Sequence, residues 1–258
     1  MRGEGKEITI KDLRTSEQAV RLFIPCYVDQ LAPAVAQAAV DLLARLDIAW
    51  SYPAAQTCCG QLSYNAGDWP AARKLMRHFF EVFPGPGPVL CPGPACVRMV
   101  RRSYTQLAET RRETAEVTRL SSQVVDLSEY LHSLGPFPFP LAWSGRVFLH
   151  QSCAARDLGF LPTYQRLLAQ VKGLELCTLP EAYSCCGFGG LFSLKQKELS
   201  QVIGWRYLQA VLGLKPQVLI SPDVGCLLHL RGIAAAQTIQ LPMWHIAEFL
   251  VGAAQEAR

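Results

Sequence analysis

Short apolar runs alternate with amphipathic stretches along most of the chain. The runs have the length of buried strands, and the stretches between them repeat apolar residues at the three- and four-residue spacing of a helix face. In the first half the predicted strands are Leu22–Ile24, Ile48–Tyr52, Val89–Leu90 and Val124–Val125. The predicted helices there are Pro33–Leu46, the stretch capped by Asp68, the stretch that opens at Cys96, and Leu127–Leu131.

The second half repeats this order of elements. Its predicted strands are Val147–Leu149, Leu174–Leu176 and Val218–Ile220. Its predicted helices are Pro162–Val171, a long helix through Trp205, Leu208 and Leu212, a helix opened by Pro222–Cys226, and His245–Leu250, which echoes Asp126–Leu131. Strands that alternate with helices of this length predict an α/β fold of two similar halves, each a parallel sheet with helices on both faces.

The composition along the chain predicts four segments. Residues 1–20 are a polar N-terminal extension, 21–134 a first cysteine-rich repeat, and 145–252 a second one. Residues 135–144 form a linker rich in proline and phenylalanine. Its alternate prolines cannot join a helix or the ladder of a central strand, so the boundary between the halves falls here.

Cysteines mark the repeat most sharply. Each half carries one cysteine, then a Cys-Cys-Gly triplet, then one more cysteine, and the first cysteine precedes the doublet by 32 residues in both halves. The two sets are Cys26, Cys58, Cys59 and Cys96, and Cys153, Cys185, Cys186 and Cys226. The other two of the ten cysteines, Cys91 and Cys177, have no counterpart and are predicted to be buried as small hydrophobic residues.

Composition excludes several classes of protein. Half of the 258 residues are hydrophobic, 18% are charged and the net charge is +4, so an ordinary globular protein is expected and nucleic-acid binding is not. No apolar run approaches the roughly 18 residues of a membrane span. Residues 1–21 lack the apolar core of a secretory signal. A cytoplasmic location is therefore expected, in which cysteines serve as metal ligands or redox thiols.

The cysteines of both sets follow predicted strands, so three loops would bring four thiolates to the carboxyl edge of each sheet. Four thiolates suit zinc, an iron–sulfur cluster or free-thiol chemistry. The ligands come from loops more than 30 residues apart, which favours an object wider than one zinc ion. Gly60 and Gly187 would let amide groups approach the cluster sulfides. We expect one [4Fe-4S]-type cluster in each half.

The sequence resembles the cysteine-rich subunit of heterodisulfide reductase and, more closely, the lactate-utilisation protein A group. The resemblance runs from about Leu22 to Leu250. It is carried by the motifs Gln56–Gln61, Asp41–Leu46, Val171–Leu176, Cys185–Gly190 and His245–Glu248. It departs from heterodisulfide reductase where that family pairs its last cysteine as Cys-x-x-Cys, because this chain has Gly93 and Asp223 at the partner positions. The absence of the fifth cysteines argues against five-thiolate clusters and against thiol–disulfide chemistry at them.

The resemblance implies an iron–sulfur electron-transfer subunit of a multi-protein oxidoreductase that converts L-lactate, or a related 2-hydroxy acid, to pyruvate. It also implies a ferredoxin-like iron–sulfur subunit and a further small subunit as partners, because this chain lacks the ferredoxin cysteine run. Two other functions stay open. One is a thiol–disulfide reductase of the heterodisulfide reductase type, and the other is a non-catalytic zinc-binding scaffold.

Polar residues near the cysteines supply further candidates. His150, three residues before Cys153, is the candidate catalytic residue, with a hydrogen-bonded structural histidine as the alternative. Asp223 is expected to cap the helix that carries Cys226 rather than to bind metal. Side chains that could bind a carboxylate or screen cluster charge, or lie on the surface, are Arg98, Arg156 and Lys195. His245 is expected to be structural.

Overall fold

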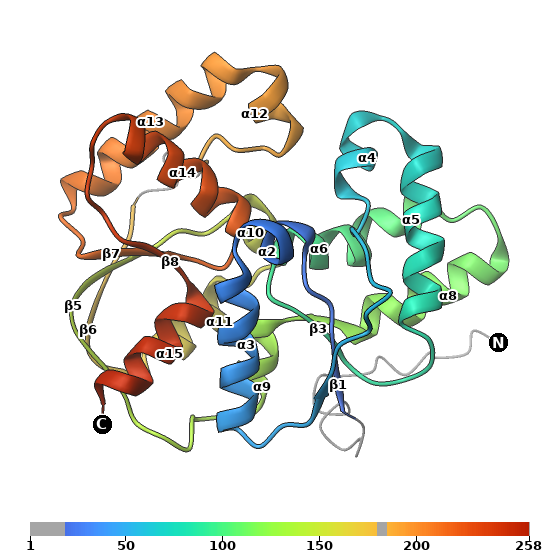
Figure 1. The fold of residues 1–258 in the computed structure, drawn as a ribbon, viewed down its shortest axis with the longest axis horizontal. Coiled ribbons are helices and arrows are strands. Elements are labelled where there is room, and N and C mark those ends of the chain that lie inside the picture. The colour runs from blue at the N-terminus through green and yellow to red at the C-terminus, as the bar shows by residue number, and fades with distance from the viewer. Residues whose placement is uncertain (1–18, 180–184, 258) are drawn as a thin grey trace, which may run out of the picture.

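The computed structural model describes residues 19–179 and 185–257 (Figure 1). Two parallel four-stranded sheets, with strand orders β2-β1-β3-β4 and β6-β5-β7-β8, confirm the predicted α/β architecture of two similar halves. The strands of the first sheet are β1 (Val20–Leu22), β2 (Trp50–Ser51), β3 (Val89–Cys91) and β4 (Val124–Asp126). Those of the second are β5 (Leu141–Leu149), β6 (Val171–Cys177), β7 (Val218–Ser221) and β8 (Met243–His245).

Helices connect the strands and cover both faces of each sheet. Those of the first half are α2 (Cys26–Leu31), α3 (Pro33–Arg45), α4 (Gln61–Ala66), α5 (Trp69–Val82), α6 (Pro94–Arg98), the π-helical turn η1 (Met99–Ser103), α7 (Tyr104–Leu107), α8 (Arg111–Gln123) and α9 (Leu127–Ser133). Those of the second are α10 (Cys153–Asp157), α11 (Leu161–Leu168), α12 (Leu191–Lys195), α13 (Lys197–Gly213), α14 (Val224–Ala236) and α15 (Ile246–Glu256). In each half the first connection runs from a central strand to the edge strand, from β1 to β2 and from β5 to β6. The second connection crosses back over the first strand, to β3 and to β7. Right-handed crossovers of this kind place successive helices on opposite faces.

Capping side chains fix where several helices begin. Asp68 caps α5 as predicted, accepting a hydrogen bond from the Ala71 amide, and Thr110 forms a capping box at the start of α8. Asp126 and His245 stand at equivalent positions in the two halves, and each forms a capping box at the last helix of its half. The sequence echo between these two segments therefore reflects one shared local structure.

The two halves lie side by side (Figure 1), and the contacts between them come in matching pairs of equivalent helices. Helix α3 packs on α15, and the equivalent pair α11 and α9 makes the matching contact. Helices α6 and α10 also touch, as do their equivalents α14 and α2, while α4 meets its own counterpart α12. One hydrophobic core includes Leu42 and Leu43 from the first half and Phe249 and Leu250 from the second. Both halves therefore contribute to one hydrophobic core, which stabilises their packing against each other.

Several element boundaries differ from the prediction. Strand β1 ends at Leu22, because the side chain of Gln56 accepts the hydrogen bond of the Ile24 amide at 2.7 Å and so replaces a neighbouring strand. The pattern missed β8, a three-residue strand whose residue Met243 pairs with Leu219 of β7. The division into repeats and linker stays a prediction. Residues 135–140 hold no helix or strand, β5 begins at Leu141, and residues 1–18 of the predicted extension lie outside the described residues.

Within residues 19–179 and 185–257, no helix combines the length and the apolar character that a membrane crossing would require. The topology indicates that a functional site would lie at one edge of each sheet. In each sheet the strand order reverses beside the first strand, between β1 and β3 and between β5 and β7. Sites in open parallel sheets form beyond the carboxyl ends of the strands at such a reversal.

Candidate metal centre

All eight cysteines of the repeated motif line one cavity of about 220 Å³ between the two halves. The sequence predicts two separate groups of thiols, one in each half. The structure groups the thiols of each half and also turns both groups toward a shared space. The symmetrical packing of α2 on α14 and of α6 on α10 explains the arrangement, because these helices carry or adjoin the cysteines. All ten cysteines of the chain are free thiols.

In the first half, three loops deliver the four thiols. Cys26 is the first residue of α2, directly after the loop from β1, and Cys96 lies in the first turn of α6 beyond β3. The doublet precedes α4. Its sulfur atoms lie close to those of the single cysteines, with 3.8 Å between Cys26 and Cys58 and 3.2 Å between Cys59 and Cys96. The doublet therefore links the two single cysteines into one group.

The second half repeats this construction. Cys153 is the first residue of α10, which Ser152 caps, and Cys226 lies in the first turn of α14. The sulfur atoms of Cys186 and Cys226 are 2.9 Å apart, and Cys153 shares a hydrogen bond with Cys185. Cys153 and Cys185 are exposed, whereas Cys26 and Cys58 are partly buried. The second group is thus the more open of the two.

The glycine after each doublet has the same role in both halves. The amide of Gly60 lies 3.4 Å from the sulfur of Cys58, and the amide of Gly187 lies 3.4 Å from the sulfur of Cys185. Both glycines have φ of +86°, a left-handed conformation in which a side chain is strained. Each amide therefore lies beside a thiol of the site, and its approach to cluster sulfides stays a prediction.

Neighbouring thiols and backbone amides make one member of most pairs acidic. Hydrogen bonds from Cys26 and Cys59 lower the pKa of Cys58 to about 3, while the pKa of Cys26 is raised by the same bond to Cys58. A hydrogen bond from Cys153 lowers the pKa of Cys185 to about 6. Helix N-termini beside the cysteines favour the thiolate further. Each group therefore supplies thiolates, which are the form that binds soft metals.

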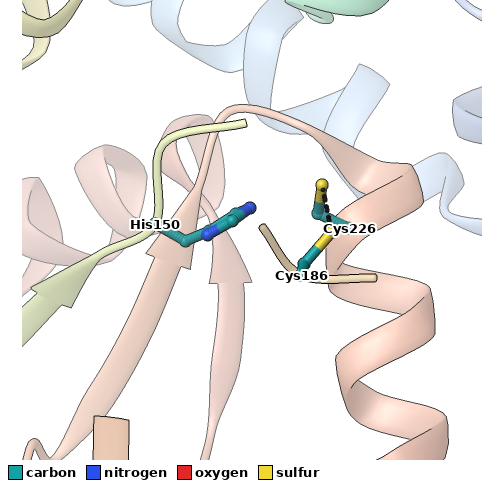
Figure 2. Close-up of side chains that lie close together, drawn as sticks. All are labelled: His150, Cys186 and Cys226. Atoms are coloured by element: carbon teal, nitrogen blue, oxygen red, sulfur yellow. Dashed lines mark hydrogen bonds between the residues drawn. The ribbon is translucent and has the colours of Figure 1, made fainter. Parts of the chain in front are cut away.

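His150 belongs to the second group of thiols (Figure 2). Its ring nitrogen and the sulfur atoms of Cys186 and Cys226 all lie within 4.8 Å of one another, and Figure 2 shows the ring directed toward the two sulfurs. The hydrogen bond from Cys226, with a further contribution from His150, lowers the pKa of Cys186 to about 4. The Nδ1 atom lies 2.5 Å from the hydroxyl of Tyr207. The buried Nε2 atom has no hydrogen-bond partner in the described part of the chain.

The other candidates are placed more simply. Asp223 caps α14 and accepts a hydrogen bond from the Gly225 amide at 3.0 Å, so the expected cap is confirmed. His245 is structural as expected, because its ring accepts from the Ala247 amide and its other nitrogen contacts the Pro222 carbonyl. Arg98 of the first half pairs with Asp157 of the second at 2.6 Å, Arg156 lies 3.4 Å from the sulfur of Cys153, and Lys195 is exposed at the end of α12.

Sequence reasoning missed three residues around the cavity. Tyr27 and Phe188 each come from a cysteine loop, and their rings meet across the two halves. Cys91, predicted to be a bystander, is fully buried but also hydrogen-bonds Cys96, whereas Cys177 does not line the cavity. Aromatic residues one or two positions from a cysteine were the available signal for the first pair. No spacing rule points to Cys91, because the second half has Ser221 at its position.

The fold and the paired cysteine groups define a two-repeat, cysteine-rich α/β protein. A family model described as the cysteine-rich domain, CCG, matches residues 20–101 and 147–231. These segments cover more than half of the chain, and they hold all eight cysteines of the cavity. The chain belongs to the CCG cysteine-rich domain family.

Full-length relatives agree with this assignment. The chain is 36% identical to Lactate utilization protein A of Geobacillus kaustophilus and 32% identical to Lactate utilization protein A of Bacillus subtilis. Each alignment covers 90% of this chain and 98% of the relative. Among solved structures, a hypothetical protein from Helicobacter pylori matches with a TM-score of 0.64 and 10% identity, over 94% of this chain and 50% of that one. This last likeness concerns the fold alone.

Proposed function

We propose that the chain is an iron–sulfur subunit of a multi-protein oxidoreductase that oxidises L-lactate to pyruvate. The observation that carries the proposal is the grouping of eight thiols, four from each half, around one cavity. The relatives named Lactate utilization protein A support the choice of lactate. Oxidation of lactate to pyruvate releases two electrons and two protons, and two one-electron centres would provide the capacity for the electron pair.

The residues around the cavity fit such clusters. Cys26, Cys58, Cys59 and Cys96 would hold the first cluster, and Cys153, Cys185, Cys186 and Cys226 the second. The amide of each Cys-Cys-Gly glycine already lies near a sulfur, as expected around an anionic cluster. The buried Nε2 atom of His150 also faces this site, and it has no hydrogen-bond partner among the described residues. A cluster bound here would give this polar atom a partner. The donor set is all sulfur apart from this histidine, which favours iron–sulfur chemistry.

His150 has a proposed role as a positioning residue for the second cluster. Burial, first, and then nearby thiolates raise the pKa of Tyr207, so its hydroxyl keeps its proton and can donate a hydrogen bond to Nδ1 of His150, 2.5 Å away. We infer that this bond leaves the ring N–H on Nε2, which faces Cys186 and Cys226. Such a donor stabilises negative charge on the sulfur ligands. The equivalent position in the first half is Phe23, so the two clusters would differ in potential.

A partner must receive the electrons, because no further cysteine group exists among residues 19–179 and 185–257. The proposed partners are a ferredoxin-like iron–sulfur subunit and a further small subunit of the same system. The proposed location is the cytoplasm, where reducing conditions keep all ten thiols free. The alternative function is a thiol–disulfide reductase. It is favoured by the exposure of the second group and by the close contact of the Cys186 and Cys226 sulfur atoms.

The test is anaerobic co-purification of the chain with the other subunits, followed by addition of L-lactate. The proposal predicts that lactate reduces the bound clusters, seen by paramagnetic resonance, with one pyruvate formed for each electron pair. D-lactate and glycolate serve as matched substrates for selectivity. Reduction of small disulfides by the isolated chain, without any response to a 2-hydroxy acid, would instead establish the reductase function. Zinc without acid-labile sulfide would establish the scaffold.

A further inference from the structure

One surface of the second half is not covered by any of residues 19–179 and 185–257. A groove of about 810 Å³ runs between α13 and α14, and its floor includes Trp205, Leu228 and Ile233. Its rim carries Leu194 of α12 and Val202 of α13, whose side chains are 78% and 54% exposed. Exposed aliphatic residues beside an apolar floor are typical of a surface that binds another polypeptide.

The first half shows what covers the equivalent surface. Arg73 and Arg77 are the fifth and ninth residues of α5, and both bind the segment that leads from α7 into α8. The Arg73 guanidinium donates to the Leu107 carbonyl at 3.2 Å, and Arg77 pairs with Glu109 at 3.0 Å and with Glu113 at 2.6 Å. This face of α5 is therefore closed by a helical segment of the same chain.

The second half lacks this covering segment. Gln201 and Trp205 are the fifth and ninth residues of α13, and both line the groove. Helix α14 runs without interruption to Ala236, and the chain then passes directly to β8, so no counterpart of α8 is built. A Cβ atom added to Gly232 of α14 would meet no atom within 4 Å, so the space above that helix is open.

The groove also adjoins the second group of thiols. Ser200 lines the groove, and its hydroxyl donates to the carbonyl of Gly187 at 2.7 Å. His229, on the opposite wall, lies 3.4 Å from the same hydroxyl. A polypeptide seated in the groove would therefore be one layer of side chains away from the loop that carries Cys185 and Cys186. This closeness points to a partner that exchanges electrons with the site.

We propose that the α13–α14 groove binds a short helical segment of the electron-transfer partner, in the place that α8 takes in the first half. This inference deepens the proposed function and depends on it. The positions that are arginines in the first half are Gln201 and Trp205 here, so the segment would present apolar side chains rather than the acidic ones of α8. Trp205 is the expected anchor, because tryptophan often dominates the binding energy of an interface.

The test measures binding of the purified ferredoxin-like subunit to the complete, cluster-loaded chain by anaerobic calorimetry. Val202→Glu places a charge on the apolar rim, and Gly232→Leu adds a side chain where a Cβ atom meets nothing within 4 Å. Both should weaken binding by about 30-fold or more. The control is Lys74→Glu at the sixth residue of α5, which is equivalent to Val202, and should change binding by less than about threefold.

Three results would overturn the proposal. One is binding by both groove variants within about threefold of the parent, and another is absence of binding by the parent itself. The third is a change of occupant: loss of a homodimer in Val202→Glu, or tighter binding after deletion of residues 1–18, would show that this chain itself fills the groove. Iron and sulfide counts on the same samples keep the two proposals distinguishable. A parent that contains no cluster refutes the proposed function, whereas a loaded variant with unchanged binding refutes only the docking site.

Discussion

The ring of Phe188, two residues after Cys186, packs edge-on against Tyr27, the residue after Cys26, with the ring centroids 5.9 Å apart. The two rings come from different halves and both line the cavity of the eight cysteines. Such edge-to-face pairs contribute roughly 0.5–1.5 kcal/mol beyond the area they bury. The contact therefore ties the two cysteine loops together at the point where the halves meet.

Phe188 and Gly225 should be energetically coupled. A Cβ atom added to Gly225 would lie 2.5 Å from Cε1 of Phe188, so Gly225→Ala forces the ring to move. We expect this change to lower the free energy of unfolding by about 1–3 kcal/mol in the parent and by much less when Phe188→Ala is present. Chemical denaturation of the two single variants and the double variant measures the coupling. Strictly additive effects would contradict the contact.

The two Cys-Cys-Gly glycines should differ in their tolerance of alanine. Both have φ of +86°, but a Cβ atom on Gly187 would lie 2.5 Å from the Ser200 carbonyl oxygen, whereas one on Gly60 would lie 3.4 Å from Leu75. Gly60→Ala should therefore cost about 1–2 kcal/mol of stability from backbone strain alone. Gly187→Ala should cost clearly more, because backbone must shift as well. Thermal denaturation compares them, and equal costs would refute the steric explanation.

His245 should make stability depend on pH. Burial lowers its pKa to about 4 and nearby Arg231 lowers it further, whereas the hydrogen bond to the Pro222 carbonyl opposes this shift. A second proton on the ring would also break the bond that Nδ1 accepts from the Ala247 amide. The unfolded chain has a pKa near 6.5, so this contribution is complete above pH 6.5 and is lost as pH falls toward 4. His245→Asn keeps a capping side chain and removes the titration. Between pH 7.5 and 5, its stability relative to the parent should rise by about 2 kcal/mol.

A control for this prediction lies at the equivalent cap in the first half. Burial raises the pKa of Asp126 to about 7, so its contribution changes with pH in the opposite sense and is lost as pH rises from about 4 to 7. The stability of the Asp126→Asn variant relative to the parent should therefore increase as pH rises. Denaturation curves at both pH values on each variant provide the measurement. A His245→Asn curve that runs parallel to the parent at both values would show that the ring does not titrate as described.

His150→Phe should lower the reduction potential of the second cluster only. The change copies Phe23 of the first half and removes the ring nitrogen that faces Cys186 and Cys226. Loss of one hydrogen bond to a charged sulfur corresponds to a shift on the order of 100 mV for one electron. A redox titration followed by paramagnetic resonance separates the two signals. His150→Gln, which retains a donor, should restore part of the shift, and two unchanged potentials would remove His150 from this role.

The sequence predicted the features that a repeat and its periodicities determine. Spacing grouped Cys26 with its set, alternation of strands and helices predicted the two parallel sheets, and Asp223 was correctly expected to be a helix cap. The shared cavity was not predictable in this way, because it depends on how α2 meets α14 and α6 meets α10 across the halves. Packing between distant surfaces leaves no local period in a sequence.

The uncovered groove illustrates a second limit. Leu194 and Val202 lie on helices whose apolar residues extend around most of the surface, so the pattern does not show which face is buried. In the fold, α8 covers the face of α5 that carries Arg73 and Arg77, whereas no described helix covers the equivalent face of α13. The strand β8 escaped detection for a related reason, since three residues are too few to establish an alternation.

Iron and acid-labile sulfide counts on anaerobically purified protein test the central claim most directly. We predict about eight iron and eight sulfide per chain, the content of two four-iron clusters, with about half remaining in Cys59→Ala or Cys186→Ala. Cys177→Ala, at a cysteine outside the cavity, should keep the full content. Zinc in place of iron, no sulfide, or an equal loss in Cys177→Ala would contradict the assignment of the eight thiols to two clusters.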